Sequence, residues 1–396
     1  MSNATKEEIP LSRATVLGTE LAYIQDAISR GKLNGGQHYS KLCEAWMESR
    51  YGAAKAFLTP SCTHSLEAAA LLCDIQPGDE VVMPSYTFSS TANAFVFRGA
   101  QIRFVDIRPD TQNIDENLIE AAITPRTKAI VPVHYAGVSC EMDRIIEIAD
   151  AYHLYVVEDA AQGMHAAWRG KALGTMGDFG CFSFHATKNY TMGEGGALLL
   201  RDSGRALDTA VICEKGTNRT AFLQGAVDQY TWVGKGSSYL ASELAAAYLY
   251  AQLQDADAIN ERRLHLWERY YRQLSGLAQR ERIELPVVPR YCRHNGHIFY
   301  MKLSSFKERK ALIKHLKGDG IAAAFHYIPL HTSIQGRVCG SFVGKDRFTT
   351  DTSQRLLRLP LYNAMTDAQV DRVCESIFAF FRTTLRKEEA AQGFGA

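Results

Sequence analysis

The stretch KAIVPVHYAGVSCEMDRIIEIADAYHLYVVED, residues 128–159, decides the fold of this 396-residue chain. Two apolar runs, at 128–134 and 154–159, flank a segment at 141–153 whose apolar residues recur at helical spacing. Both runs are apolar throughout rather than alternating with polar residues, which is typical of strands covered on both faces of a parallel sheet. The stretch therefore predicts one strand–helix–strand unit.

The same alternation extends from about residue 52 to 200. Further strand-like runs are AKAFL at 54–58, EVVMP at 80–84 and QIRFVDI at 101–107, and helical spacing recurs at 65–75, 91–99 and 115–123. This pattern predicts a doubly wound α/β domain with a mostly parallel sheet, whose ligand binds at the carboxyl ends of the strands.

The chain changes character after residue 200. Residues 240–275 predict one long helix or two consecutive ones. A strand at 297–303, a helix near 307–317, the apolar segment IAAAFHYIP and a helix near 366–382 follow. We predict a large α/β domain with an N-terminal arm at 1–255 and a small C-terminal α+β domain at 256–396.

The composition excludes several classes of function. A net charge of +1 gives no electrostatic case for nucleic acid or a membrane surface as the main partner. No apolar run reaches the roughly 18 residues of a membrane span, and the N-terminal MSNATKEEIPLSR lacks the apolar core of a signal peptide. The nine cysteines show neither a disulfide framework nor metal-ligand spacing, so we expect no metal and a reducing cytoplasm.

A single lysine, Lys188, lies in FSFHATKNYTMGEGG at 182–196, between an apolar run and a glycine cluster. A lysine that forms a Schiff base must lose its proton, and a partly buried site favours this because burial disfavours the cation. The glycines let the backbone approach a bulky ligand closely. His185 lies three residues earlier, and both a structural role and a ligand contact are open for it.

The segment TPSCTHSLEAA at 59–69 places small polar residues where a strand ends and a helix begins. Free N–H groups at a helix start bind anions, and hydroxyl groups add donors. Two interpretations are open for Cys62 and Thr63, namely a phosphate-binding site and an ordinary helix cap.

The segment VVEDAAQG at 156–163 ends a buried strand in two carboxylates, Glu158 and Asp159. A carboxylate at the edge of a parallel sheet is costly to bury unless it is paired. Asp159 is therefore a candidate partner for a protonated ring nitrogen of a cofactor, while a metal ligand and an ordinary strand-end acid are the alternatives.

A phosphate site, an acid and a lysine follow one another on one α/β domain. Pyridoxal phosphate requires these three groups, as phosphate anchor, electron-sink partner and Schiff-base lysine. An aromatic ring to stack on the pyridine would complete the set. Phe88, in MPSYTFSST, lies at a suitable place, and Tyr86 competes with it for that role.

In this ordered set of motifs the chain resembles a fold-type I, pyridoxal-phosphate-dependent nucleotide-sugar aminotransferase of the DegT/StrS family. The resemblance runs from GKLNGG at 31–36 to RLPLY at 358–362. It rests on PSCTHSLEAA, MPSYTFSSTANA, VPVHYAG, VEDAAQG, CFSFHATKN and GEGGALL. EKGTNR at 214–219 and the segment 230–253 make it most similar to the members that aminate C4 of dTDP-4-keto-6-deoxyglucose.

The resemblance implies a role for each matching residue. Lys188 carries the cofactor and moves the proton, Asp159 holds the pyridine nitrogen protonated, and Gln162 contacts the phenolic oxygen. Phe88 stacks on the ring, and the phosphate is held by the amides of Cys62 and Thr63 and by the hydroxyl of Ser183. In GSSYL, Ser238 stands where many relatives have a phosphate-binding asparagine contributed by the neighbouring subunit.

The same resemblance implies the reactants. L-glutamate donates the amino group and a dTDP-sugar accepts it, giving dTDP-4-amino-4,6-dideoxy-D-galactose; the gluco epimer is the alternative. A dehydratase of the same fold is disfavoured because Lys188 is present, and a non-catalytic regulator because Lys188, Asp159 and Ser183 are intact. Candidate substrate contacts, each with a structural alternative, are His185, Lys215, Arg219, His326, Tyr327 and His331. We expect a homodimer or a higher homo-oligomer.

Overall fold

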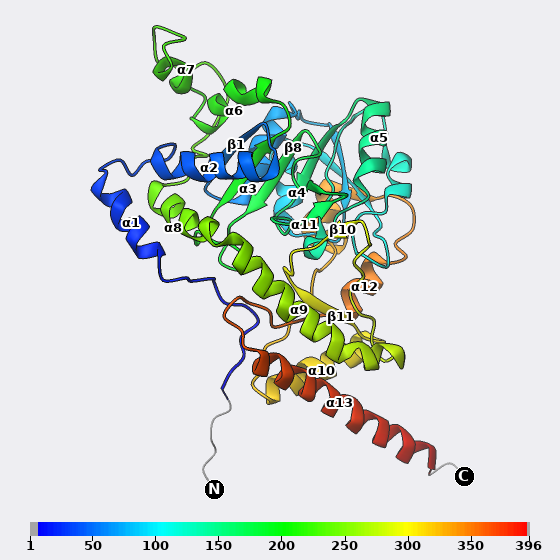
Figure 1. Cartoon of the computed structure of the whole chain (residues 1–396). Helices are drawn as coiled ribbons and strands as arrows, with labels where there is room; N and C mark the ends of the chain where they lie inside the picture. Colours follow the sequence, from blue (N-terminus) through cyan, green and yellow to red (C-terminus); the bar gives the residue numbers. More distant parts are fainter. Residues whose placement is uncertain (1–6, 394–396) are drawn as a thin grey trace.

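A sheet of eight strands organises the computed structural model, which describes residues 7–393 and the side chains of residues 7–383 (Figure 1). All of its strands except β9 run parallel to one another. Across the sheet the strands are β1 (Lys55–Thr59), β9 (Gly196–Leu200), β8 (Phe179–Ser183), β5 (Tyr155–Asp159), β4 (Thr127–Ile130), β2 (Glu80–Pro84), β3 (Gln101–Val105) and β12 (Gly340–Phe342). The predicted fold class, α/β with a mostly parallel sheet, is confirmed.

The strands are rich in consecutive apolar residues because successive residues enter cores on opposite faces of the sheet. In β2, Val81 packs with helices α3 (Cys62–Leu72), α4 (Ser89–Val96) and α6 (Ala206–Cys213), whereas Val82 packs with α5 (Met142–Tyr152). In β9, Leu199 faces α1 (Glu20–Ser29), α2 (His38–Tyr51) and α8 (Glu243–Gln254). Helices therefore cover both faces, as a doubly wound sheet requires.

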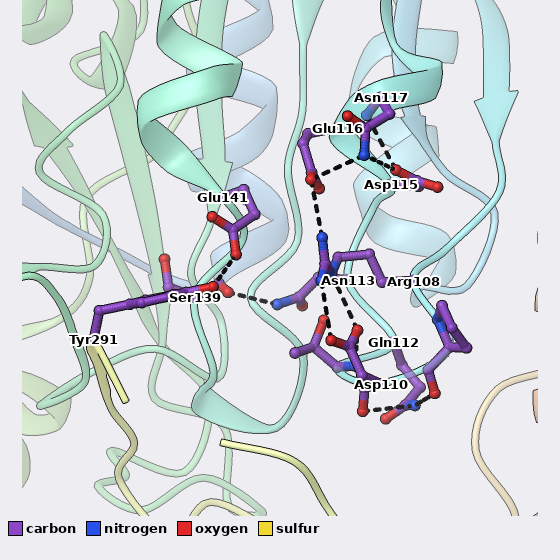
Figure 2. Close-up of polar contacts among 12 residues, drawn as sticks. Arg108, Asp110, Gln112, Asn113, Asp115, Glu116, Asn117, Ser139, Glu141 and Tyr291 are labelled. Carbon is purple, nitrogen blue, oxygen red and sulfur yellow. Dashed lines mark hydrogen bonds and ion pairs between the residues drawn. The ribbon is translucent and has the colours of Figure 1, made fainter. Parts of the chain in front are cut away.

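The predicted helix at 115–123 is wrong, since the segment forms two 3₁₀ turns at Glu116–Leu118 and Glu120–Ala122. The Asp115 side chain accepts hydrogen bonds from both the backbone and the side chain of Asn117, at 3.1 and 3.0 Å. Such local bonds compete with a continuous helix. Figure 2 shows these contacts. Beside them, the guanidinium of Arg108 forms ion pairs with the carboxylates of Asp110 and Glu116, at 3.0 and 2.9 Å.

The loop around Asn113 is hydrogen-bonded to the connection that follows β4. The buried Asn113 amide donates to the carbonyl oxygens of Val138 and Ser139 at 3.1 and 2.8 Å (Figure 2). Its oxygen accepts from the N–H of Tyr135 at 2.9 Å. The connection after β4 is thereby fixed at the carboxyl edge of the sheet.

Residues 240–275 form two consecutive helices, α8 and α9 (Ala256–Gln279). Helix α9 leads to a second core that it builds with α10 (Phe306–Gly318), α13 (Asp367–Gly393) and the antiparallel pair β11 (Phe299–Lys302) and β13 (Leu356–Leu359) (Figure 1). The remaining elements are α7 (Arg219–Leu223), α11 (Ile334–Cys339), α12 (Thr349–Arg355) and a small sheet of β10 (Cys292–Arg293), β6 (Ala167–Trp168) and β7 (Lys171–Ala172). Within the described range no helix has both the length and the apolar character needed to cross a bilayer.

Two segments cross the predicted domain boundary at 255/256. Strand β12 pairs with β3 at the edge of the large sheet, and Ile9 packs into the C-terminal core, bridging Ile321. The segment 321–329 is not a strand, because its residues make only isolated bridges, at Ile321 and Ala324. The boundary itself stays a prediction, and its outer ends, 1–6 and 394–396, lie outside the described residues.

Two glycines predict opposite effects of the same substitution. A Cβ at Gly180, in β8, would lie 1.9 Å from the carbonyl oxygen of Gly174, whereas a Cβ at Gly276, in α9, would meet nothing within 4 Å. We expect Gly180→Ala to lower the free energy of unfolding by about 3 kcal/mol through overpacking. Gly276→Ala should raise it by about 0.5–1 kcal/mol, because alanine favours the helix. Urea unfolding followed by circular dichroism measures both, and equal effects of the two changes would contradict the packing.

Candidate active site

The sheet brings the predicted cofactor residues other than Ser238 to one edge. Strand β1 ends at Thr59 and β8 ends at Ser183, and Gly196 pairs with both of them. Strand β5 ends in Asp159 beside β8. Helix α3, the loop carrying Lys188 and Asp159 therefore start from the same carboxyl edge, where doubly wound sheets bind ligands.

Lys188 lies half-buried in the loop between β8 and β9. Burial, reinforced by the charge of Arg358, lowers the pKa of its ammonium group, although Cys62 and Asp159 act in the other direction. A lowered pKa increases the fraction of free amine, which is the form that can act as a nucleophile or base.

The residue after the lysine fixes its loop. Asn189 is buried, donates to the carbonyl oxygen of Asn295 at 3.0 Å and contacts Nδ1 of His297 at 2.9 Å. The hydroxyl of Thr15 donates to the carbonyl oxygen of Asn189 at 3.0 Å. The backbone beside Lys188 is thus held by two distant parts of the chain.

Asp159 is buried, and both of its carboxylate oxygens are hydrogen-bonded. Thr91 donates through its hydroxyl to Oδ2 at 2.7 Å, and the N–H of Ala161 donates to Oδ1 at 3.1 Å. These bonds fix the position of the carboxylate at the end of β5, and its role toward a ring nitrogen stays a prediction.

The neighbouring Glu158 points into the opposite core and is fully buried. It accepts from His134 Nε2 at 2.8 Å and from the N–H groups of Gly174, Met176 and Gly177 at 2.7–2.8 Å. His134 Nδ1 accepts from a backbone N–H at 3.1 Å, so its proton is on Nε2. Burial alone would raise the pKa of Glu158, but the bonds from His134 and the glycine amides hold it below its ordinary value.

Gln162 joins the large sheet to the C-terminal part of the chain. Its oxygen accepts from the N–H of Ala136 at 2.7 Å, and its amide donates to the hydroxyl of Tyr327 at 3.0 Å. Tyr327 stacks on His326, with ring centroids 3.6 Å apart. Two of the predicted substrate contacts therefore lie beside a predicted cofactor contact.

The start of α3 fits a phosphate group. Ser61 caps the helix by accepting from the N–H of His64. The N–H groups of Cys62 and Thr63 have no acceptor within the described part of the chain. A Cβ on Gly196 would lie 2.4 Å from the Cys62 nitrogen, so the strand passes directly behind these donors. Two free N–H groups at a helix start suit an anion.

The structure separates the two candidate stacking residues. Tyr86 is 1% exposed and donates its hydroxyl proton to the carbonyl oxygen of His326, whereas Phe88 is 61% exposed at the start of α4. The Tyr86 ring is thereby committed to packing, and Phe88 is free to meet a ligand.

Three predicted contacts lie elsewhere, in a hollow of about 300 Å³. The hollow is lined by Lys215, Arg219 and Ser238 together with Asn34 and Gly35. The residues at the carboxyl edge of the sheet, such as Lys188 and Asp159, do not line it. Arg219 is paired with Glu214 at 2.9 Å, while Lys215 is exposed. The resemblance placed Ser238 in a neighbouring subunit's site, and that role stays a prediction.

Two histidines make structural contacts. His185 contacts Thr187 at 2.9 Å and Glu194 at 3.4 Å within its own loop. His331 contacts Ser85 at 2.7 Å and Asp346 at 3.2 Å. Their roles toward a substrate stay predictions.

Sequence reasoning missed Arg358, Asn295 and His297. Asn295 donates to the carbonyl oxygens of Gln162 and Met164, both at 2.7 Å, and so supports the turn after Asp159. Asn295 and His297 fall in none of the motifs named above. The one available signal was the arginine in RLPLY, which precedes a proline at the end of an apolar run.

The lysine, the fixed carboxylate and the helix start on one sheet edge are the groups that pyridoxal phosphate requires, and the fold is that of the fold-type I aminotransferases. The chain belongs to the DegT/DnrJ/EryC1/StrS aminotransferase family, whose model matches residues 16–378.

Individual relatives cover nearly the whole chain. SpsC, a spore coat polysaccharide biosynthesis protein of Bacillus subtilis, is 34% identical over 385 residues, covering 93% of this chain and 96% of SpsC. The aminotransferase TlmJ of Streptoalloteichus hindustanus superimposes with a TM-score of 0.87 at 28% identity, over 95% of this chain and 100% of TlmJ. NtdA of Bacillus subtilis, solved with bound cofactor PMP, gives 0.83 at 29% identity, over 93% of this chain and 83% of NtdA.

The buried Glu158 predicts an acid-sensitive fold. Because its pKa is lowered in the folded state, its stabilisation is present above the unfolded-state pKa of about 4.3 and is lost as the pH falls through the lower folded-state value. Glu158→Gln should cost about 3 kcal/mol at pH 7, since one partner of a buried pair is removed, and should flatten the loss of stability below pH 4.

Urea unfolding at pH 7 and in the acid range measures this dependence. Glu147→Gln is the matched control, because its carboxylate is 68% exposed and its ion pair with Arg144 contributes under about 1 kcal/mol. Equal pH profiles for the wild type and Glu158→Gln would contradict the assignment.

Proposed function

We propose that the chain is a dTDP-4-amino-4,6-dideoxygalactose transaminase, which moves an amino group from L-glutamate to C4 of dTDP-4-keto-6-deoxy-D-glucose. The observation that carries the transamination is geometric: Asp159, the loop of Lys188 and the free N–H groups of α3 meet at the carboxyl edge of one sheet. The segments 214–219 and 230–253 support the choice of sugar, and SpsC, named for polysaccharide biosynthesis, supports a role in surface sugars. Nine free cysteines favour a cytoplasmic enzyme.

Each of the predicted site residues has a separate role in such a transfer. Bound pyridoxal phosphate supplies an electron sink for the carbon that carries the amino group. Asp159 keeps the ring nitrogen protonated, Phe88 covers the ring, and Cys62, Thr63 and Ser183 hold the phosphate. Lys188 Nζ takes a proton from the α-carbon of L-glutamate and later delivers one to C4 of the sugar.

The direction of that last proton sets the product. Delivery from one face leaves the new amine axial, as in the galacto sugar, and delivery from the other leaves it equatorial, as in the gluco sugar. Lys188 serves both outcomes, so the orientation of the sugar decides between them. His326 and Tyr327, beside Gln162, are the side chains proposed to set it.

The hollow containing Lys215, Arg219 and Ser238 supports a homodimer or a higher homo-oligomer. Two cationic side chains, Lys215 and Arg219, line the hollow. No residue at the carboxyl edge of the same chain's sheet, such as Lys188 or Asp159, lines it. We assign it to the diphosphate of the nucleotide sugar and to the cofactor phosphate bound by a second copy of the chain.

The product distinguishes the two epimers. We expect the purified protein, supplied with pyridoxal phosphate, L-glutamate and dTDP-4-keto-6-deoxyglucose, to form an aminated sugar with a small coupling between sugar H3 and H4, because the galacto amine is axial. Proton NMR of the product measures this coupling. A large coupling would show that the product is the gluco epimer. An unaminated sugar would refute the proposed substrate.

Mixing two inactive variants tests the shared site. Lys188→Ala removes the proton-transfer group, and Lys215→Glu should lower kcat/KM for the sugar roughly 100-fold by repelling its diphosphate. If Lys215 serves the partner's site, random subunit exchange should restore about a quarter of the wild-type activity, because half of the dimers then hold one intact site. If Lys215 serves its own chain's site, the mixture stays no more active than its components. Lys171→Glu, on an exposed lysine of β7, is the control for a change of charge.

A further inference from the structure

Residues 295–297 form a buried segment between β10 and β11. Arg263, from α9, donates to the carbonyl oxygens of Gly296 and His297 at 3.2 and 2.6 Å. The side-chain oxygen of Asn295 accepts from the N–H of His297 at 3.1 Å. Gly296 has a φ of +57°, and a Cβ there would lie 3.0 Å from the backbone of Arg263, so the position suits glycine. The backbone that carries the His297 ring is therefore fixed.

The His297 ring is neutral, and its proton is on Nδ1. Burial, followed by the charge of Lys188, lowers the pKa of the ring well below its ordinary value. The amide nitrogen of Asn189 donates to the carbonyl oxygen of Asn295 at 3.0 Å, so the amide oxygen of Asn189 is the acceptor that faces the ring. Nδ1 of His297 therefore donates to that oxygen, at 2.9 Å. Both polar atoms of the Asn189 side chain are thus bonded to residues 295–297.

The same segment also holds the turn that follows Asp159. The side-chain amide of Asn295 donates to the carbonyl oxygen of Gln162 at 2.7 Å, and Gln162 lies three residues after Asp159. Asn189, the other partner of the segment, directly follows Lys188. One buried segment therefore connects the turn after the carboxylate to the loop of the lysine, and so sets the position of one relative to the other.

The loop of Lys188 has few other supports. Between β8 and β9 the chain forms neither helix nor strand. The N–H of Lys188 donates to the carbonyl oxygen of His185 at 2.9 Å, and the hydroxyl of Thr15 donates to the carbonyl oxygen of Asn189 at 3.0 Å. Loss of the bond from His297 would leave the side-chain oxygen of the buried Asn189 without its donor, which is costly and favours a shifted loop.

We propose that His297 is a positioning residue for Lys188, an inference that rests on the proposed transamination. Through Asn189 it fixes the loop from which Nζ takes and returns the proton. A shift of Nζ by about 1 Å slows such a transfer roughly 100-fold without weakening the binding of either reactant. Because Lys188 moves a proton in both half-reactions, both depend on His297, whereas a residue that contacts only one reactant affects only one.

Three substitutions of one residue test this role. His297→Leu removes the donor, His297→Asn keeps an amide N–H near the place of Nδ1, and His297→Gln moves it to the place of Nε2. We expect His297→Leu to lower kcat roughly 100-fold in both half-reactions and to leave KM for L-glutamate and for the keto sugar within about threefold. His297→Asn should keep kcat within about tenfold of the wild type because it retains the hydrogen bond. His297→Gln keeps a polar side chain, but it should resemble His297→Leu.

The absorbance of the bound cofactor follows each half-reaction. Rates are expressed per bound cofactor, so that a smaller folded fraction does not count as a slower transfer. His315→Leu is the matched control, because Nε2 of His315 lies 3.0 Å from the carbonyl oxygen of Ser376, between α10 and α13. It removes a histidine contact far from the loop of Lys188 and should change neither kcat nor KM.

A trapping measurement does not depend on turnover. Borohydride, added with pyridoxal phosphate to the full-length protein freed of cofactor, fixes the cofactor to Lys188, and mass spectrometry quantifies the modified peptide. The rate should be about tenfold lower in His297→Leu than in the wild type, and His297→Asn should restore it, because the amine is again correctly placed.

Equal trapping rates and equal kcat in the wild type and His297→Leu would overturn the inference. Equal losses in His297→Asn and His297→Leu would also overturn it, as would a loss confined to KM or to one half-reaction. If the wild type transfers no amino group, the proposed function fails, and the trapping comparison still decides whether His297 positions Lys188.

Discussion

The site at the carboxyl edge of the sheet depends on one set of interactions, the hydrogen bonds that the buried carboxylate of Glu158 accepts. It has no access to water, so its two oxygens must be satisfied by the protein. Three amides of the turn at 174–177 and the imidazole of His134 do this, and they come from the segment before β8 and from the loop after β4. Satisfying one charge therefore aligns three strand ends, and Asp159, the next residue, takes its position from that alignment.

Much of this architecture could be predicted from the sequence, for identifiable reasons. Strands that bury both faces are apolar at their central positions, so β2 and β5 were recognisable as runs such as EVVMP. Asp159 ends β5, Cys62 and Lys188 lie in the segments that follow β1 and β8, and parallel strands place their ends together. The helix expected at 115–123 does not form, because the Asp115 side chain accepts a hydrogen bond from the backbone N–H of Asn117. Such a local bond competes with the helix, and the spacing of apolar residues gives no sign of it.

Contacts between distant segments were beyond prediction. Arg358, Asn295 and His297 reach the site from the C-terminal third of the chain, and their role depends on which partner each side chain finds. A sequence shows that an arginine is present, but not that its Nε lacks a hydrogen-bond partner while Arg263 has carbonyl partners. The two separate groups of cations, one beside Lys188 and one around Lys215, likewise exist only once the chain is folded.

Strand β12 has a consequence for how the protein is made. It completes the edge of the large sheet beside β3, but it is synthesised about 235 residues later. At roughly 5–20 residues per second, β3 leaves the ribosome some ten seconds or more before its neighbour exists. During that interval its N–H and C=O groups form an open template to which another nascent chain can bind. The last third of the polypeptide, besides contributing to the site, thus ends a period in which the emerging protein is vulnerable to aggregation.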